Sequence, residues 1–228
     1  MPVDTEFMNK GETTLPKLNW DILDEAHTKF LNLEPRDVVY EISTELISES
    51  WNDDRKVSNA LEILLLIWNA AFYRYSTLNY LSIKDVIDRH RKELNELRDL
   101  DIAELKDDKK DIVESIYTDF LDALKSEGRG GGKKRAKELY SPVSTAKCLH
   151  LLCPKFFPLW DNKIAKGYGC HWENSKNSFE YYWKFMKINR EQVVDIRNQS
   201  PEPESLKEIS TLKLIDEYNY VHFTLKAI

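Results

Sequence analysis

The sequence contains few glycines and has a long stretch without proline. Only seven glycines occur in 228 residues, four of them within residues 128–132, and no proline lies between Pro35 and Pro142. Tight turns with a positive φ angle favour glycine, so the low glycine content argues against a sandwich, a barrel or a Rossmann sheet with many such turns. A long stretch without helix breakers, rich in Leu, Glu, Lys, Asp and Ile, indicates helices instead.

Long apolar runs and a disulfide framework are also missing. The longest strictly apolar run covers residues 63–68, far short of the ~20 residues that cross a bilayer. The first ten residues lack the basic and apolar regions of a signal peptide. Three cysteines, Cys148, Cys153 and Cys170, leave an odd thiol and indicate a reducing compartment. We therefore expect an intracellular (cytoplasmic) protein that makes no contact with a membrane.

The apolar periodicity predicts an all-α fold, a compact multi-helix domain. We expect a polar arm over residues 1–19 and a single helical domain over 20–228; the alternative is two subdomains divided by a loop over 127–134. The segment 54–75 is expected to be the central core helix, with Ile63, Leu66 and Ile67 widening its apolar stripe. The helices are expected at residues 20–33, 36–48, 54–75, 83–97, 102–126, a short stretch ending at 140, 142–153, 162–168, 175–188, 190–199 and 205–225.

Charge is distributed unevenly along this acidic chain, whose formal net charge is −6. Between residues 127 and 147 six basic residues oppose only two acidic ones, which makes this segment a local basic island. A DNA phosphate backbone would bind there, and a solvated linker is the alternative interpretation. The predicted phosphate-binding residues are Arg129, Lys133, Lys134, Arg135 and Lys137.

Residues 141–169 carry the most informative pattern, SPVSTAKCLHLLCPKFFPLWDNKIAKGYG. This segment resembles the core of the helix-hairpin-helix DNA glycosylase superfamily, in which a hairpin leads into an apolar helix and then to a proline-to-aspartate turn. Residues 144–146 match the K-T-A end of the hairpin pattern, and residues 157–161 match the turn. Both glycines of the family's hairpin pattern are missing from this sequence. Pro142 and Val143 lie near their positions. Ser144 stands where bifunctional members carry a nucleophilic lysine.

The resemblance implies a helix-hairpin-helix fold and a role in DNA repair. The implied activity is hydrolysis of the N-glycosidic bond of a modified or mismatched base in DNA. Asp161 would be the catalytic carboxylate. Ser144 implies a monofunctional enzyme that uses water, and Lys147, one turn further along, is a second-choice nucleophile.

The chemistry of the reaction supports Asp161 independently of the family. Breaking an N-glycosidic bond develops positive charge on the sugar, which a nearby carboxylate can stabilise while it orients or deprotonates water. The alternative is structural, because an aspartate between a proline turn and a helix is also a sufficient N-cap. A non-catalytic helical module that binds nucleic acid or protein is therefore the competing function.

Aromatic residues follow the same segment. An extruded base is held by stacking, and the predicted base-pocket residues are Trp160, Trp172 and Tyr181, with interior packing as the alternative. Trp68 and Asn69 on the expected core helix are assigned no role.

Metal and nucleotide sites are not expected. Zinc could use the thiols and imidazoles of Cys148, His150, Cys153, Cys170 and His171, but residues two and five apart on one helix point to different sides. The basic loop departs from the P-loop pattern at Glu127 and Lys134. We expect no metal and no cofactor.

Overall fold

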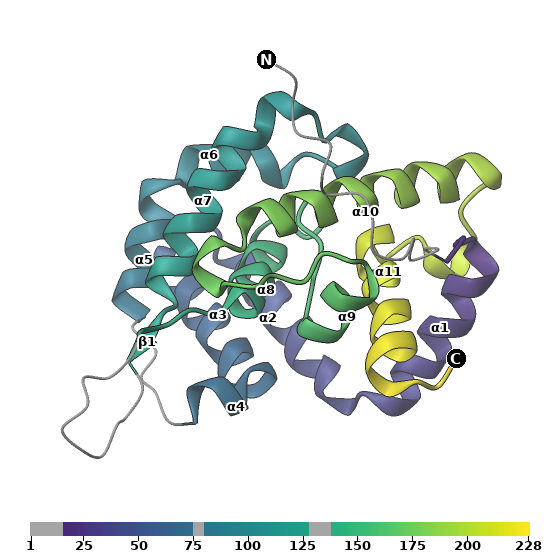
Figure 1. Cartoon of the computed structure of the whole chain (residues 1–228), viewed down its shortest axis with the longest axis horizontal. Coiled ribbons are helices and arrows are strands. Elements are labelled where there is room, and N and C mark those ends of the chain that lie inside the picture. Colours follow the sequence, from purple (N-terminus) through teal and green to yellow (C-terminus); the bar gives the residue numbers. More distant parts are fainter. Residues whose placement is uncertain (1–15, 75–79, 128–137) are drawn as a thin grey trace.

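Helices make up almost all of the regular structure (Figure 1). The computed structural model describes residues 16–74, 80–127 and 138–228. In these ranges the predicted all-α fold is confirmed, and the only strands are a two-residue antiparallel pair. No helix in the described ranges is long and apolar enough to cross a membrane.

The first half of the chain forms a series of α-helices joined by short 3-10 turns (η). In chain order these elements are α1 (Trp20–Leu33), η1 (Pro35–Asp37), α2 (Val38–Glu49), α3 (Asp54–Trp68), α4 (Ala70–Tyr73), α5 (Tyr80–Arg89), α6 (Arg91–Arg98), η2 (Ile102–Glu104), η3 (Asp107–Lys109) and α7 (Lys110–Ala123).

The second half begins with the strand pair and ends in a π-helical turn. Its elements are β1 (Ser126–Glu127), β2 (Glu138–Leu139), α8 (Pro142–Leu152), α9 (Asn162–Gly167), η4 (Ser175–Asn177), α10 (Phe179–Gln199), η5 (Glu204–Leu206), α11 (Thr211–Asn219) and the π-helical η6 (Tyr220–Leu225).

Several predicted helix boundaries are wrong. The expected helix over 54–75 is interrupted at Asn69, and the one over 83–97 is interrupted at His90. Asp101 caps the short η2 through a capping box with Glu104 and does not start a long helix. The predicted helices at 175–188 and 190–199 form one helix, α10. At the expected short helix ending at 140, residues 138–139 form strand β2, and the residues before 138 lie outside the described ranges.

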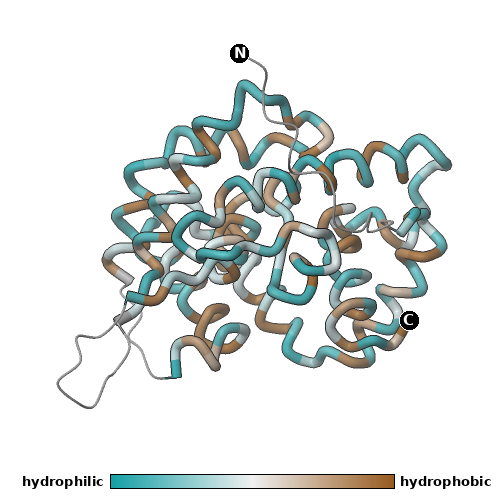
Figure 2. Tube along the Cα trace, viewed as in Figure 1, coloured by the Kyte–Doolittle hydropathy of each residue, from teal (hydrophilic) through white to brown (hydrophobic). Residues whose placement is uncertain are grey.

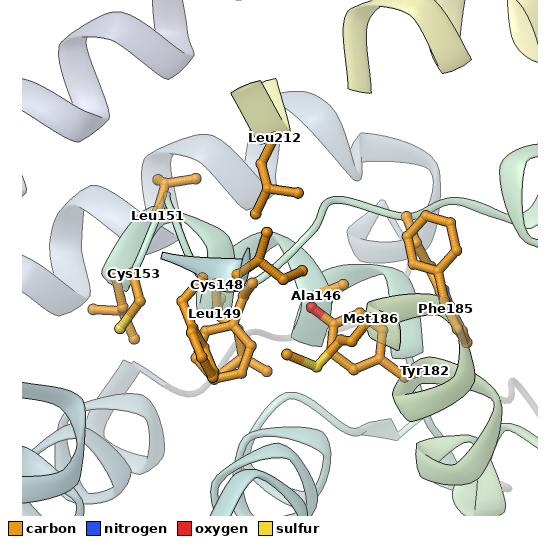
Figure 3. Packing of buried hydrophobic residues seen from close by; sticks show 14 of the residues in the cluster. Ala146, Cys148, Leu149, Leu151, Cys153, Tyr182, Phe185, Met186 and Leu212 are labelled. Atoms are coloured by element: carbon orange, nitrogen blue, oxygen red, sulfur yellow. The ribbon is translucent and has the colours of Figure 1, made fainter. Parts of the chain in front are cut away.

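The most buried helices are α8 and α11, not α3. The side chains of α8 that pack inward meet α10 and α11, as Figure 3 shows for Ala146, Leu149, Tyr182, Met186 and Leu212. Figure 2 shows apolar and hydrophilic residues mixed along the outer helices, as expected for elements that bury one side only.

On α3 the apolar stripe is only partly used. Leu61, Leu64 and Leu65 are fully buried, whereas Ile63, Leu66 and Ile67 are 40–47% exposed. The prediction that these three residues widen the core stripe is therefore wrong.

The two ends of the described chain lie together. Helix α1 packs along α11 (Figure 1), and the π-helical η6 that follows α11 packs against α9. Leu18, at the end of the predicted polar arm, is buried, and its carbonyl accepts a hydrogen bond from Gln199 Nε2 (3.0 Å). This arrangement brings α1, α8, α9 and α11 around one cavity.

Candidate functional site

A cavity of about 330 Å³ lies among these four helices, η1, η6 and the end of α3. Its volume falls at the lower end of the range for small-molecule sites, about 300–1,000 Å³. Three of the predicted site residues, Lys147, Trp160 and Asp161, line it together. The described structure therefore brings the principal predicted catalytic residues to one place, which we call the α8–α9 pocket.

The turn before Asp161 is held from two sides. His150 Nδ1 donates to the carbonyl of Phe157 (2.7 Å), and Tyr40 Oη donates to His150 Nε2 (2.9 Å). Tyr182 Oη donates to the carbonyl of Pro158 (2.9 Å). Burial lowers the pKa of His150 to about 4, so this imidazole is neutral and works as a structural tie.

Asp161 itself is a helix N-cap. Its Oδ1 accepts hydrogen bonds from the backbone N–H groups of Lys163 (2.7 Å) and Ile164 (2.8 Å), and its Oδ2 accepts one from Thr224 Oγ1 (3.2 Å). The side chain is half-buried and borders the pocket. Asp161 therefore has the N-cap role that was the structural alternative to catalysis, and its side chain also lines the pocket.

Two glycines shape the end of α9. Gly169 has a φ angle of +61°, a left-handed conformation that favours glycine. A Cβ at Gly167 would lie 2.3 Å from the ring of Phe223, so a side chain there would displace that ring of η6. This close approach carries Thr224 to Asp161.

Lys147 reaches the pocket from α8. Its Nζ donates to Asn69 Oδ1 (2.5 Å) and to the carbonyl of Trp68 (3.2 Å), and lies 5.5 Å from the Trp68 ring centroid. Burial lowers its pKa to about 8, although the carboxylates of Asp161 and Asp216 oppose the shift. The amine and ammonium forms of Lys147 are therefore both accessible near neutral pH.

Ser144 lies behind this lysine and does not line the pocket. Asn69 Nδ2 donates to Ser144 Oγ (2.6 Å), and Ser144 Oγ is 2.7 Å from Ser141 Oγ. Ser144 is fully buried, so its direct contact is with the side chain that holds Lys147.

A second carboxylate on the pocket is Asp216 of α11. Burial raises its pKa to about 7; Lys213 opposes the shift, and the nearby carboxylates of Glu217, Asp161 and Asp37 add to it. Among the described residues its carboxylate accepts no hydrogen bond and forms no ion pair.

Helix α11 is fixed in place by a buried ion cluster. Lys213 Nζ contacts Asp37 Oδ1 (2.8 Å) and Glu217 Oε1 (3.3 Å), and Glu217 Oε2 is 2.6 Å from His27 Nδ1. The ammonium also lies over the ring of Phe30 (4.4 Å). These contacts join α11 to α1 and η1 and so fix where Asp216 meets the pocket.

Glu34, which also lines the pocket, is hydrogen-bonded to Arg36 and Tyr220. Arg36 donates to both carboxylate oxygens of Glu34 (2.6 and 2.5 Å), and Tyr220 Oη donates to Glu34 Oε2 (2.7 Å). Hydrogen bonds from Arg36 lower the pKa of Glu34 to about 2.

Sequence reasoning missed Asp216, Glu34, Arg36 and Tyr220, and assigned no role to Trp68 and Asn69, which also line the pocket. One signal in the sequence pointed to this part of the pocket: Asn69 is a single polar residue in an otherwise apolar segment.

The three predicted base-pocket residues do not all line the pocket. Trp160 lines the pocket, and Trp172 stacks on it (centroids 4.8 Å apart, 1° between planes) without being a lining residue. Tyr181 is half-buried on α10 and also lies outside the lining residues. Of the three, only Trp160 borders this pocket.

The predicted phosphate-binding residues Arg129, Lys133, Lys134, Arg135 and Lys137 lie outside the described residues. Cys148, Cys153 and Cys170 are buried free thiols. Within the ranges that the structure describes, no group of three or more His, Cys, Asp or Glu side chains is arranged to hold a metal ion.

Comparisons of the chain with protein-family models, curated proteins and solved structures find no match.

Proposed function

We propose that the protein is a DNA glycosylase-like hydrolase that cleaves the N-glycosidic bond of a modified or mismatched base in the α8–α9 pocket. The observation that carries this proposal is that Asp161, Lys147 and Trp160 border one cavity. The resemblance of residues 141–169 to helix-hairpin-helix DNA glycosylases adds the substrate class.

Asp161 supports the chemistry of the sugar. Its three hydrogen-bond donors suit an ionised carboxylate and fix its orientation. A carboxylate held in this way stabilises the positive charge that develops on the sugar and accepts a proton from attacking water.

Lys147 and the aromatic wall support binding of the substrate. The Lys147 ammonium is held by Asn69 and can contact an anionic oxygen of the substrate. Half-buried Trp68 offers a ring surface on which a flat base can stack. Phe30 and Trp160 complete an aromatic wall, although both rings are almost fully buried.

A second candidate is a non-catalytic binding module on the same scaffold. The observation that favours it is the N-cap itself, because both oxygens of Asp161 already accept hydrogen bonds within the protein. It predicts DNA or protein binding that is unaffected by Asp161→Asn, and no base release.

The test is base release from duplexes carrying a panel of modified and mismatched bases. Asn caps a helix about as well as Asp, so Asp161→Asn removes the charge and keeps the cap. We expect abasic sites with the wild-type protein and a loss of at least ~100-fold in the variant. Asp88→Asn, on the exposed side of α5, is the matched control and is expected to retain full activity.

Circular dichroism and thermal unfolding check that both variants fold. Equal activity of wild type and Asp161→Asn would remove the assignment of Asp161. Absence of base release from every duplex, with salt-sensitive DNA binding that weakens when the charges at residues 133–135 are removed, would favour the binding module.

A further inference from the structure

Two carboxylates border the α8–α9 pocket from different helices. Asp161 begins α9, and Asp216 lies on α11, whose continuation η6 packs against α9. Their surroundings differ: Asp161 accepts three hydrogen bonds, whereas the Asp216 carboxylate accepts none from the part of the chain that is described.

Burial explains why Asp216 holds a proton more readily than an ordinary aspartate. The dominant effect is burial, which raises its pKa to about 7; Lys213 opposes the shift, and the carboxylates of Glu217, Asp161 and Asp37 add to it. The titratable groups that face it from its own helix and from the elements around it are Lys213, Glu217, Asp37, Lys147, Asp161, Tyr40 and Tyr168. A pair of carboxylates in such unequal surroundings divides into a proton donor and a charged partner.

We propose that Asp216 is a second catalytic residue, the general acid that protonates the departing base in the pocket it shares with Asp161. This inference rests on the proposed function. Its geometric basis is the position of Asp216 on the pocket wall and the absence, among the described residues, of any donor that would hold it as a carboxylate.

The proposed step balances as a hydrolysis. The bond between the sugar C1′ and the base nitrogen breaks, its electron pair stays on that base, and the proton of Asp216 goes to the base. Water attacks C1′ through its oxygen and loses a proton to Asp161, which returns it to solvent. Asp216 regains a proton from solvent, so one water is consumed and the free base and an abasic sugar are formed.

The experiment compares two departing bases in otherwise identical duplexes. A neutral modified base leaves as an anion unless it is protonated, whereas N7-methylguanine is cationic and leaves as a neutral molecule. Proton donation accelerates such steps by about 10²–10⁴-fold. Asp216→Asn is therefore expected to slow release of the neutral base at least ~100-fold and to leave release of N7-methylguanine within a few-fold of wild type.

The pH profile gives a second expected result. Wild-type release of the neutral base falls as pH rises above about 7, and this fall is absent for N7-methylguanine. Asp88→Asn again serves as the control, with wild-type behaviour on both bases.

The outcomes separate the two proposals. A wild-type protein that releases no base from any duplex of the panel overturns the proposed function and this inference together. A wild-type protein that is active while Asp216→Asn slows both bases equally, or neither, overturns only the role of Asp216.

A further measurement does not require the variant to fold. In ¹³C-labelled wild-type protein the carboxyl carbon of Asp216 should titrate at about pH 7. A titration near the ordinary aspartate value of about 3.9 overturns the inference.

Discussion

Two regions of the molecule differ in where their charged side chains lie. The first, called the α5–α7 region, is formed by α5, α6 and α7. The second, called the pocket region, is formed by α1, α8, α9 and α11. In the α5–α7 region the buried side chains are mainly apolar, and the ion pairs of Asp119 with Arg89 (2.6 Å) and His90 (2.8 Å) lie at the partly exposed edge. In the described chain, the four least exposed Lys, Asp and Glu residues all lie around the pocket: Glu34, Asp37, Lys213 and Glu217.

Buried charge is expensive in stability, and well-packed apolar residues often replace it without loss. Perturbed titratable groups also tend to collect at functional sites. We infer that the α5–α7 region is built for stability and that the pocket region gives up stability to hold reactive groups. The following predictions test that contrast.

The largest effect is expected in the apolar region. Phe120 of α7 is fully buried, so Phe120→Ala should lower the free energy of unfolding by about 3–5 kcal/mol. Base release should be unchanged at temperatures where the variant is folded. Urea unfolding measures the loss, and a value below ~1 kcal/mol would show that α7 does not anchor the core.

Asp216→Asn should raise the free energy of unfolding, whereas Phe120→Ala lowers it. The pKa of Asp216 is raised from 3.8 to about 7, so the folded state holds a proton that the unfolded state loses, and wild-type stability falls as pH rises from about 4 to about 7. The variant should remove this fall and gain about 2 kcal/mol at pH 7.5. Urea unfolding at a series of pH values checks it; a variant with the wild-type pH dependence would contradict the burial of charge at Asp216.

Lys147→Met should also stabilise the protein. Burial lowers the Lys147 pKa to about 8, so wild-type stability rises as pH increases from about 8 to the unfolded-state value near 10.4. At pH 7 the buried ammonium costs stability, and Met should raise the free energy of unfolding by about 1–2 kcal/mol while it abolishes base release. Thermal unfolding at pH 7 measures the change. A clear destabilisation would mean that Lys147 is a structural cation.

The smallest change in the free energy of unfolding is expected at Asp119, which pairs with Arg89 and His90 at the partly exposed edge of the α5–α7 region. Burial opposes ionisation of Asp119, but hydrogen bonds from His90 and Arg89 lower its pKa. Its contribution is present above the unfolded-state pKa and is lost as pH falls through the folded-state value. Asp119→Asn should cost less than ~1 kcal/mol at pH 7, and a larger loss in urea unfolding would blur the contrast between the regions.

Local signals in the sequence predicted much of the fold. The bounds of α1 follow from Asn19, whose side chain accepts from the Ile22 N–H (2.9 Å), and from Pro35 beyond its end. The N-cap at Asp161 is predictable for the same reason, since it needs only neighbouring residues. Features of this kind depend on a few positions along the chain.

Contacts between distant segments could not be predicted in this way. The break of the core helix at Asn69 accompanies hydrogen bonds to Ser144 and Lys147, which are more than 70 residues away. Likewise, the periodicity of α11 does not separate Asp216 from other polar positions, because the charged groups that act on it include Asp37 of η1, Lys147 of α8 and Asp161 of α9. Only the family resemblance, and no local signal, places Asp161 and Lys147 in one site.

The most direct test of the central claim, that Asp161 stabilises positive charge on the sugar in the α8–α9 pocket, is a binding measurement. One duplex carries a cationic pyrrolidine in place of a sugar, and a second carries a neutral tetrahydrofuran at the same position. The wild-type protein should bind the cationic duplex at least ~100-fold more tightly, and Asp161→Asn should lose that preference. Equal wild-type affinity for the two duplexes would contradict the claim.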